Sequence, residues 1–409
     1  MQTPLPLWTR PGPQLAAYAL LLIVTPFLLL RAYLQQAIGE LSRTPLPGGD
    51  GEFLLMPWLA LLAAGASAWL LRRQLRPRSL AVLAGVLALW AAGHQVADYY
   101  FGHLPTDLQQ NWHTLAYLIF AGLFWRWHVR RGRPAHLAAL PGLGAALLLS
   151  ACDETIQVFI SSRIFDVGDI GKDAWGAAIG LGAVTVHQAW PALAREGWRP
   201  WRPRWRDYRQ AAVPQLALNL GAAWLLLGVG SLLTDLRYLP WALLGWLGLT
   251  GGAVLLVHGL GRPGWRVLLG GLLSLGALGL GASHLLQPRD RIQACGRHWI
   301  VYSGLPLPAF DVLIRPDGGF RLVDKKHAFG TRDQQTLLRL PADILLIGSG
   351  FTGQGGLGFP EGLPVQFLPG LELERAVQLI VLPTPQACAV FNRLKDEGRR
   401  VTFVVHVSC

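Results

Sequence analysis

Charged residues are scarce in this chain of 409 residues. They make up 15% of it, whereas ordinary soluble proteins carry about a quarter. The hydrophobic share is 52% and the mean hydropathy is +0.35. This composition excludes a chain that is soluble throughout and indicates that most of the chain is embedded in a membrane.

Cysteine is also rare. The four cysteines nowhere form the C-x-x-C spacing of a zinc site, so cysteine chemistry is not expected to be the main function. The net charge of +12 does not indicate nucleic-acid binding, because the arginines lie in short clusters between hydrophobic stretches. That placement is typical of the loops of a membrane protein.

Nine hydrophobic stretches are long enough, or nearly so, for a helix of roughly 20 residues to cross a bilayer. They cover residues 13–32, 53–71, 79–97, 111–127, 136–158, 172–190, 211–233, 240–260 and 266–286. The stretches 111–127 and 172–190 are short and contain polar residues. We therefore expect a polytopic α-helical membrane protein of about nine spans, followed by a C-terminal soluble α/β domain.

Arginine placement predicts the orientation. Arginines concentrate in alternate loops, at 72–78, 126–133, 195–209 and 262–266, and such loops are cytoplasmic. With nine spans in a bacterial inner membrane, the N-terminus is cytoplasmic and the region after residue 286 is extracytoplasmic. The expected domains are a helical membrane domain at 1–190, three further spans at 191–286 and the soluble domain at 287–409.

Polar residues gather at the predicted outer ends of the helices. They are Asp98, His113, Asp153, Glu154, Gln157, Arg163, Asp166, Asp169 and Asp173. Ionisable residues in spans are costly and indicate function. Because residues three or four apart share a helix face, the side chains of 153–157 are expected to point the same way. Gly176 and Gly180 then form a small-xxx-small face for close helix packing.

The stretch 153–180 resembles the signature of the VanZ-like membrane family. In that family DE-x-x-Q is followed by R-x-x-D-x-x-D and then N-x-x-G-x-x-x-G, and a lone histidine opens an earlier span. The resemblance covers about residues 15–190, and the matching positions are His113, Asp153, Glu154, Gln157, Arg163, Asp166, Asp169, Gly176 and Gly180. The chain has Asp173 where the family usually has asparagine.

The resemblance implies a site that binds or acts on a lipid or polyprenyl phosphate headgroup, so the expected partner is a membrane lipid. We expect His113 and Glu154 to exchange protons and Arg163 to hold a phosphate oxygen. The catalytic set is His113, Asp153, Glu154, Gln157 and Arg163. The substrate-binding set is Asp98, Asp166, Asp169 and Asp173, the last three of which also suit a divalent cation.

Two hypotheses stay open at this stage. In the first the polar residues handle a headgroup, with or without catalysis. In the second they are a buried network that locks helices together, and the chain is a non-enzymatic accessory or assembly subunit of a larger membrane complex. A closed and dry arrangement of the helices would favour the second hypothesis.

After Pro288 the long hydrophobic stretches give way to short strand-like stretches. Strand-like stretches at 298–301, 311–314, 320–323, 344–347, 379–382 and 401–407 and an amphipathic helix at 385–397 predict one compact α/β domain. Gly348, Gly350 and Gly353 spell G-x-G-x-x-G. However, further glycines and Pro360 follow where a dinucleotide loop needs a helix, so no cofactor is expected.

The C-terminal domain resembles a small α/β family that includes a mitochondrial complex I assembly factor. The resemblance covers about residues 302–407, and its matching positions are Asp343, Gly348, Gly350, Thr384, Ala387, Asn392, Leu394, Glu397, Arg399 and Val401, with Phe391 in place of a usual tyrosine. It implies a module that docks a protein partner.

Two cysteines flank this domain. Cys295 precedes its first strand-like stretch and Cys409 follows the last, so in an oxidising compartment they are the candidates for a disulfide. Cys388 is expected to remain a reduced, buried thiol in the amphipathic helix.

Overall fold

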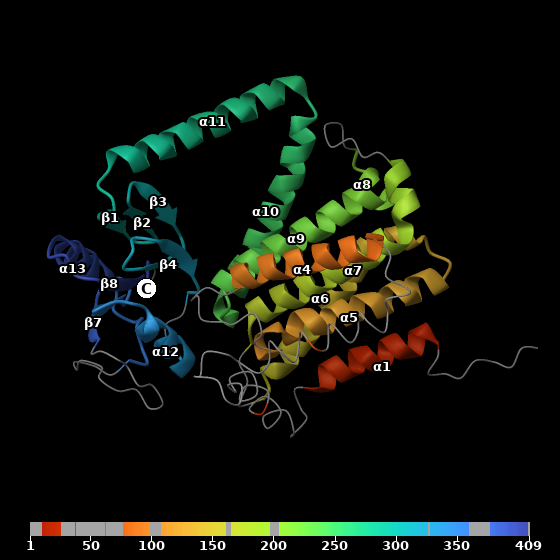
Figure 1. Cartoon of the computed structure of the whole chain (residues 1–409), viewed down its shortest axis with the longest axis horizontal. Helices are drawn as coiled ribbons and strands as arrows, with labels where there is room; N and C mark the ends of the chain where they lie inside the picture. The colour runs from red at the N-terminus through yellow and green to blue at the C-terminus, as the bar shows by residue number, and fades with distance from the viewer. Residues whose placement is uncertain are drawn as a thin grey trace, which may run out of the picture. The chain divides into compact units, whose positions relative to one another are not determined.

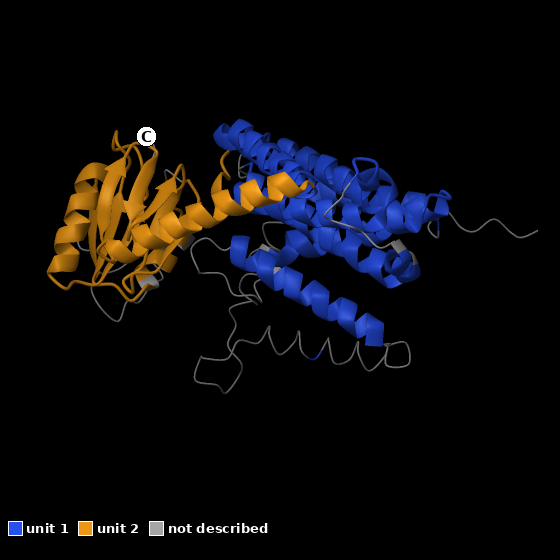
Figure 2. Ribbon diagram, turned by 90° about the horizontal axis from the view of Figure 1, so that it is seen from above, with its two compact units in different colours: residues 1–97, 103–231, 236–261 blue, residues 98–102, 232–235, 262–409 orange. Residues whose placement is uncertain are grey.

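The computed structural model describes residues 10–25, 37, 62, 77–97, 108–160, 165–196, 204–325, 328–359 and 377–407. Two compact units make up the chain (Figures 1 and 2). The first comprises residues 1–97, 103–231 and 236–261, and the second comprises 98–102, 232–235 and 262–409.

The described part of the first unit is helical. Its helices are α1 (Pro11–Val24), α4 (Pro77–Ala97), α5 (Leu108–Arg130), α6 (Ala139–Gln157), α7 (Val167–Glu196), α8 (Asp207–Gln210), α9 (Ala212–Leu232) and α10 (Leu239–Leu260), with short 3₁₀ turns at Ala135–Leu137 and Leu236–Tyr238. The long helix α11 (Pro263–Leu286) belongs to the second unit.

Five helices in the described residues are long and apolar enough to cross a membrane. They are Pro77–Ala97, Ala139–Gln157, Ala212–Leu232, Leu236–Leu260 and Pro263–Leu286. The predicted count of nine is therefore not confirmed. Helices form over 111–127 and 172–190, as expected, but their polar residues keep them out of this group. The first predicted span extends past the described α1, and the span at 53–71 lies almost wholly outside the described residues.

Helix α7 is the centre of the first unit and packs against α4, α5 and α6. Trp175 donates from Nε1 to the Leu89 carbonyl of α4 at 3.1 Å and meets Trp224 of α9 edge to face at 5.2 Å between ring centres. Asn219 of α9 donates to the Ala178 carbonyl at 3.3 Å. These polar contacts fix the register of three helices that apolar packing alone would leave free to slide.

The predicted glycine face of α7 is where α5 comes closest. A Cβ at Gly176 would collide with the backbone of Thr114, and one at Gly180 would lie 2.7 Å from the Ala121 Cβ. Only residues without a side chain permit this approach. The close contact brings the first turns of α5 and α7 side by side, which positions the candidate site.

The second unit carries two sheets. Strands β1 (Ile292–Gly296), β2 (Trp299–Tyr302) and β3 (Leu305–Pro308) form an antiparallel meander. A five-stranded sheet has the order β5-β4-β8-β6-β7, with β4 (Asp311–Ile314), β5 (Phe320–Val323), β6 (Ile344–Gly348), β7 (Gln378–Leu382) and β8 (Val401–Val405). Strand β6 pairs parallel with β7 and β8, whereas β4 pairs antiparallel with β5 and β8.

Both faces of the larger sheet are covered, which explains its unbroken apolar strands. Ile344 and Leu346 of β6 pack with the helix α13 (Thr384–Asp396) and the β1–β2 hairpin. Leu345 and Ile347 point to the opposite face, into a cluster that includes residues of α12 (Thr331–Arg339). The predicted C-terminal α/β domain is confirmed as a sheet domain.

Candidate functional site

Two aspartates of α7 hold His113, which lies in the second turn of α5. The His113 Nδ1 lies 3.0 Å from an oxygen of Asp173, and its Nε2 lies 3.3 Å from an oxygen of Asp169. The aspartates are four residues apart, so they stand one above the other on the helix face that meets α5. The ring is thereby fixed in position, and 16% of its side chain remains exposed.

Asp173 is completely buried, yet its second oxygen also has a partner. Ser150 of α6 donates its hydroxyl to this oxygen at 2.6 Å. Lys172, beside it on α7, pairs with Asp169 at 2.8 Å and keeps 17% of its side chain exposed. One lysine and one histidine thus face the two carboxylates. This pairing offsets the high cost of burying an aspartate among apolar helices.

Glu154 and Gln157 close the same end of α6. Glu154 is fully buried; one oxygen accepts from the Gln157 amide at 2.8 Å and the other from the Asp166 backbone N–H at 3.0 Å. The carboxylate therefore ties the end of α6 to the chain that enters α7. We call the whole group the polar cluster: His113, Ser150, Glu154, Gln157, Asp169, Lys172 and Asp173.

The structure assigns different neighbours to several predicted site residues. The hydrogen-bond partner of His113 is Asp173 rather than Glu154. Asp153 accepts a long bond of 3.4 Å from Gln157, and Asp166 accepts from the Gly168 N–H at 2.7 Å, in a turn that opens α7. Asp98 and Arg163 lie outside the described residues.

The expected divalent cation has no site in the described residues, where no group of three or more potential ligands is placed to hold a metal ion. The reason is local. Asp169 is paired with a lysine and a histidine, and Asp173 with a histidine and a serine. The oxygens of these two aspartates already face positive charge or hydrogen-bond donors. They therefore do not converge on one point at which a cation could bind.

Sequence reasoning missed two members of the cluster. Ser150 lies four residues before Glu154, and the helical spacing that grouped 153–157 would also have placed it on that face. Lys172 lies three residues after Asp169, the spacing of an ion pair within a helix. Both signals were present in the sequence.

The G-x-G-x-x-G stretch of the second unit forms turns in its described part, residues 349–359, where a dinucleotide loop would begin a helix. Gly350, Gly353, Gly356 and Gly358 all have positive φ, a conformation that favours glycine. The glycines thus serve a tight, irregular loop.

The sequence model of the VanZ/LLP1 family matches residues 53–188, a range that contains the whole polar cluster. The helical unit is therefore that of a membrane protein with a VanZ-like segment. Curated protein sequences give no match. A solved structure named MT938 is similar at 22% identity, with 29% of this chain and 98% of that chain covered and a TM-score of 0.23.

Proposed function

We propose that this chain is a bacterial envelope membrane protein that binds a phosphate-bearing lipid headgroup at the polar cluster. Glu154 and Asp173 are fully buried, as the structural hypothesis expects. The observation that carries the proposal is that the His113 ring, which two carboxylates of α7 fix, and the Lys172 ammonium beside it keep 16% and 17% of their side chains exposed. A histidine oriented by a carboxylate is a common proton donor and acceptor. Asp169 takes one of the three N–H donors of the Lys172 ammonium, and the ammonium has further donors and a positive charge for phosphate.

The ends of α5 support an outward-facing cluster. His113 lies near its first residue, whereas Arg126 and Arg130 lie at its last turns and Arg131 and Arg133 follow. Arginine-rich ends are retained on the cytoplasmic side. By this rule we infer that the cluster faces outward at the inner membrane. The five long helices that follow in the described part of the chain, α6, α7, α9, α10 and α11, would then carry the chain to the outside, so we propose that the C-terminal sheet domain is extracytoplasmic and docks a protein partner there.

A matched pair of lipids tests the headgroup proposal. The full chain in detergent is titrated with a polyprenyl monophosphate and with the polyprenol that lacks only the phosphate, and bound lipid is counted by native mass spectrometry. We expect the phosphate form to bind at least tenfold more tightly. Equal binding would contradict the proposal and favour the rival hypothesis, a structural cluster in an accessory or assembly subunit. A new lipid product in the same spectra would establish catalysis.

Replacing Lys172 with glutamine is expected to weaken polyprenyl phosphate binding by roughly 10- to 100-fold. A hydrogen bond to a charged group contributes about 1.5–3 kcal/mol, and 1.4 kcal/mol is a factor of ten. Binding of the polyprenol should not change, and Lys172→Arg should restore most of the affinity. Arg393→Gln, which removes one exposed positive charge from the C-terminal domain, serves as the matched control. Equal affinity in the Lys172→Gln and control variants would exclude a direct contact.

A further inference from the structure

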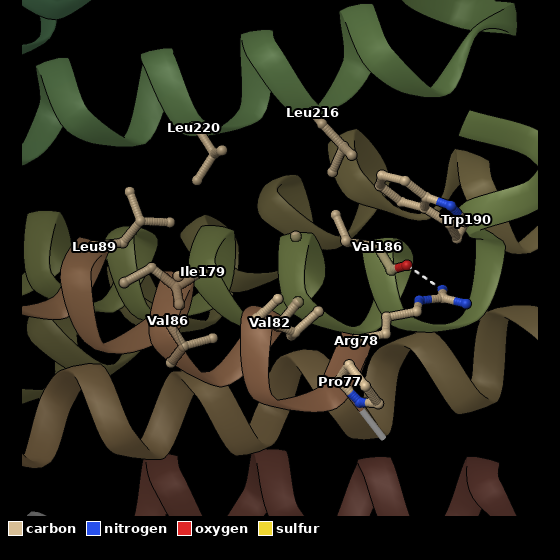
Figure 3. Close-up of a pocket in the computed structure, with 14 residues that line it drawn as sticks. Pro77, Arg78, Val82, Val86, Leu89, Ile179, Val186, Trp190, Leu216 and Leu220 are labelled. Carbon is tan, nitrogen blue, oxygen red and sulfur yellow. Dashed lines mark hydrogen bonds between the residues drawn. The ribbon is translucent and has the colours of Figure 1, made fainter. Parts of the chain in front are cut away.

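An apolar groove runs between α4, α7 and α9 (Figure 3). Its volume is about 570 Å³, and Arg78 is the only charged residue among the fourteen that line it. Val82, Val86 and Leu89 contribute one wall from α4, and Leu216 and Leu220 face them from α9. In a membrane, such a hollow suits a hydrocarbon chain.

Arg78 marks one end of the groove. Its guanidinium donates to the Val186 carbonyl and lies 5.9 Å from the centre of the Trp190 ring. The arginine Nε is buried without a hydrogen-bond partner among the described residues. A buried donor is costly unless an acceptor meets it. A phosphate oxygen is the acceptor that an arginine at a membrane interface ordinarily meets.

The groove is a site distinct from the polar cluster. Asp173 and Val186 both lie on α7 and are 13 residues apart, which is about 20 Å of helix. Trp175 lies between them and bonds to α4 at Leu89. A ligand of the groove therefore approaches from the other end of the helices.

We propose that the groove holds one acyl chain of an anionic phospholipid whose phosphate pairs with Arg78. The apolar walls accommodate the chain, the arginine neutralises the headgroup, and Trp190 beside the arginine is a residue type that favours the membrane interface. Recognition depends on the net negative charge of the lipid, so a zwitterionic lipid with the same acyl chains should be held less tightly.

Glycines in the groove allow a test that leaves the fold intact. A Cβ at Gly182, which lines the groove, would meet nothing within 4 Å, and the same holds for Gly144 on the exposed face of α6. Gly182→Leu therefore fills the groove, whereas Gly144→Leu adds the same side chain elsewhere. Both changes improve helix propensity.

The full chain is extracted from nanodiscs of mixed phosphatidylglycerol and phosphatidylcholine with identical acyl chains, and retained lipid is measured by native mass spectrometry. We expect phosphatidylglycerol to be enriched about tenfold in the wild type and in Gly144→Leu, and the enrichment to be lost in Gly182→Leu and Arg78→Gln. Enrichment that survives Gly182→Leu, or an equal retention of both lipids by the wild type, overturns the proposal.

A second inference concerns two cysteines of the sheet domain. Cys295 of β1 and Cys388 of α13 have their sulfur atoms 2.8 Å apart. Cys388 is buried and Cys295 is half-buried. Cys409 lies outside the described residues, so the predicted bridge between Cys295 and Cys409 stays a prediction; what the structure places beside Cys295 is Cys388.

One face of α13 is held along β1 over two turns. Asn392, four residues after Cys388, donates to the Ile292 carbonyl at 2.8 Å and accepts from the Ile292 N–H at 2.9 Å. Asp396, a further four residues on, accepts from Arg291 at 2.7 Å. These contacts fix the helix against the strand and hold the two sulfur atoms together.

From this geometry we infer that Cys295 and Cys388 form a disulfide through exchange with the disulfide of a thiol oxidant. The more accessible Cys295 thiolate attacks the oxidant disulfide and displaces one oxidant thiolate. Cys388, after losing its proton, then attacks the Cys295 sulfur and displaces the second. The protein loses two electrons and two protons, and the oxidant becomes a dithiol.

The ionisation of the pair fits these roles. The hydrogen bond from Cys388 lowers the pKa of the Cys295 thiol, and a lower pKa favours the attacking thiolate. The same hydrogen bond, together with burial, raises the pKa of Cys388. Cys295 is therefore the first of the two to react.

The test maps thiols in the purified full chain after equilibration with oxidised glutathione. We expect a linked peptide pair containing Cys295 and Cys388. Cys388→Ser should leave Cys295 as a mixed disulfide with glutathione. A wild-type chain that gives the mixed disulfide at Cys295, or a bridge from Cys295 to Cys409, overturns the inference.

Discussion

Replacing Gly176 with alanine is expected to lower the free energy of unfolding of the helical unit by about 3 kcal/mol or more. Overpacking costs about 1–3 kcal/mol when side chains can adjust. At Gly176 the added methyl group meets the backbone of Thr114, which cannot rotate away. The two helices must separate, and their separation would also pull His113 away from Asp173. Unfolding of the full chain in mixed micelles during an SDS titration measures the effect.

Gly182→Ala is the matched control, since it is the same change on the same helix. Nothing lies within 4 Å of the added atom, so the substitution should be neutral or stabilise the helix by up to about 1 kcal/mol. If both variants unfold at the same SDS concentration, α5 and α7 do not pack as closely as described.

Asp311→Ala is expected to destabilise the sheet domain by about 3–5 kcal/mol, because two buried hydrogen-bond donors lose their acceptor and each costs about 1–3 kcal/mol. Asp311 is fully buried. It accepts from the Val407 N–H at 3.0 Å and pairs with the Nδ1 of His406, also buried. Alanine leaves two buried donors without this acceptor. Hydrogen exchange of the β8 amides in the full chain should accelerate by a hundredfold or more, because 1.4 kcal/mol is a factor of ten.

Asp396→Ala provides the comparison for this result. Its carboxylate is largely exposed and pairs with Arg291 at the surface, and such pairs contribute no more than about 1 kcal/mol. Exchange of the β8 amides should change by less than a factor of about five. Similar acceleration in both variants would mean that the buried pair has no special role in the domain.

Elements with a strong local pattern were predictable from the sequence. Strand β6 was expected from its continuous apolar residues, and α13 from apolar residues at helical spacing; both form within one residue of the predicted limits. Strand β3 was missed because Pro306 and Pro308 suggest a break, although prolines are tolerated at a sheet edge. Helix α12 was missed because few of its residues are apolar.

The site was predictable in composition but not in pairing. Helical spacing placed Asp169 and Asp173 on one face, yet their partner His113 is some sixty residues away in the sequence. Which side chain of α7 His113 contacts depends on the register of α5 against α7, and the close approach at Gly176 sets that register. The contact of Cys295 with Cys388 likewise depends on how α13 crosses β1. The local periodicity of the sequence does not specify how segments far apart in the chain are aligned.

The central claim, that the polar cluster binds a phosphate headgroup, can be tested with a distance measurement. The chain contains only four lysines, Lys172, Lys325, Lys326 and Lys395, so ¹⁵N-lysine labelling gives few signals. Solid-state NMR of the full chain in bilayers with a polyprenyl monophosphate should show dipolar coupling between the lipid ³¹P and one ammonium ¹⁵N, and Lys172→Gln should remove that signal. Absence of coupling in the wild type, or coupling that persists in Lys172→Gln, would contradict the account.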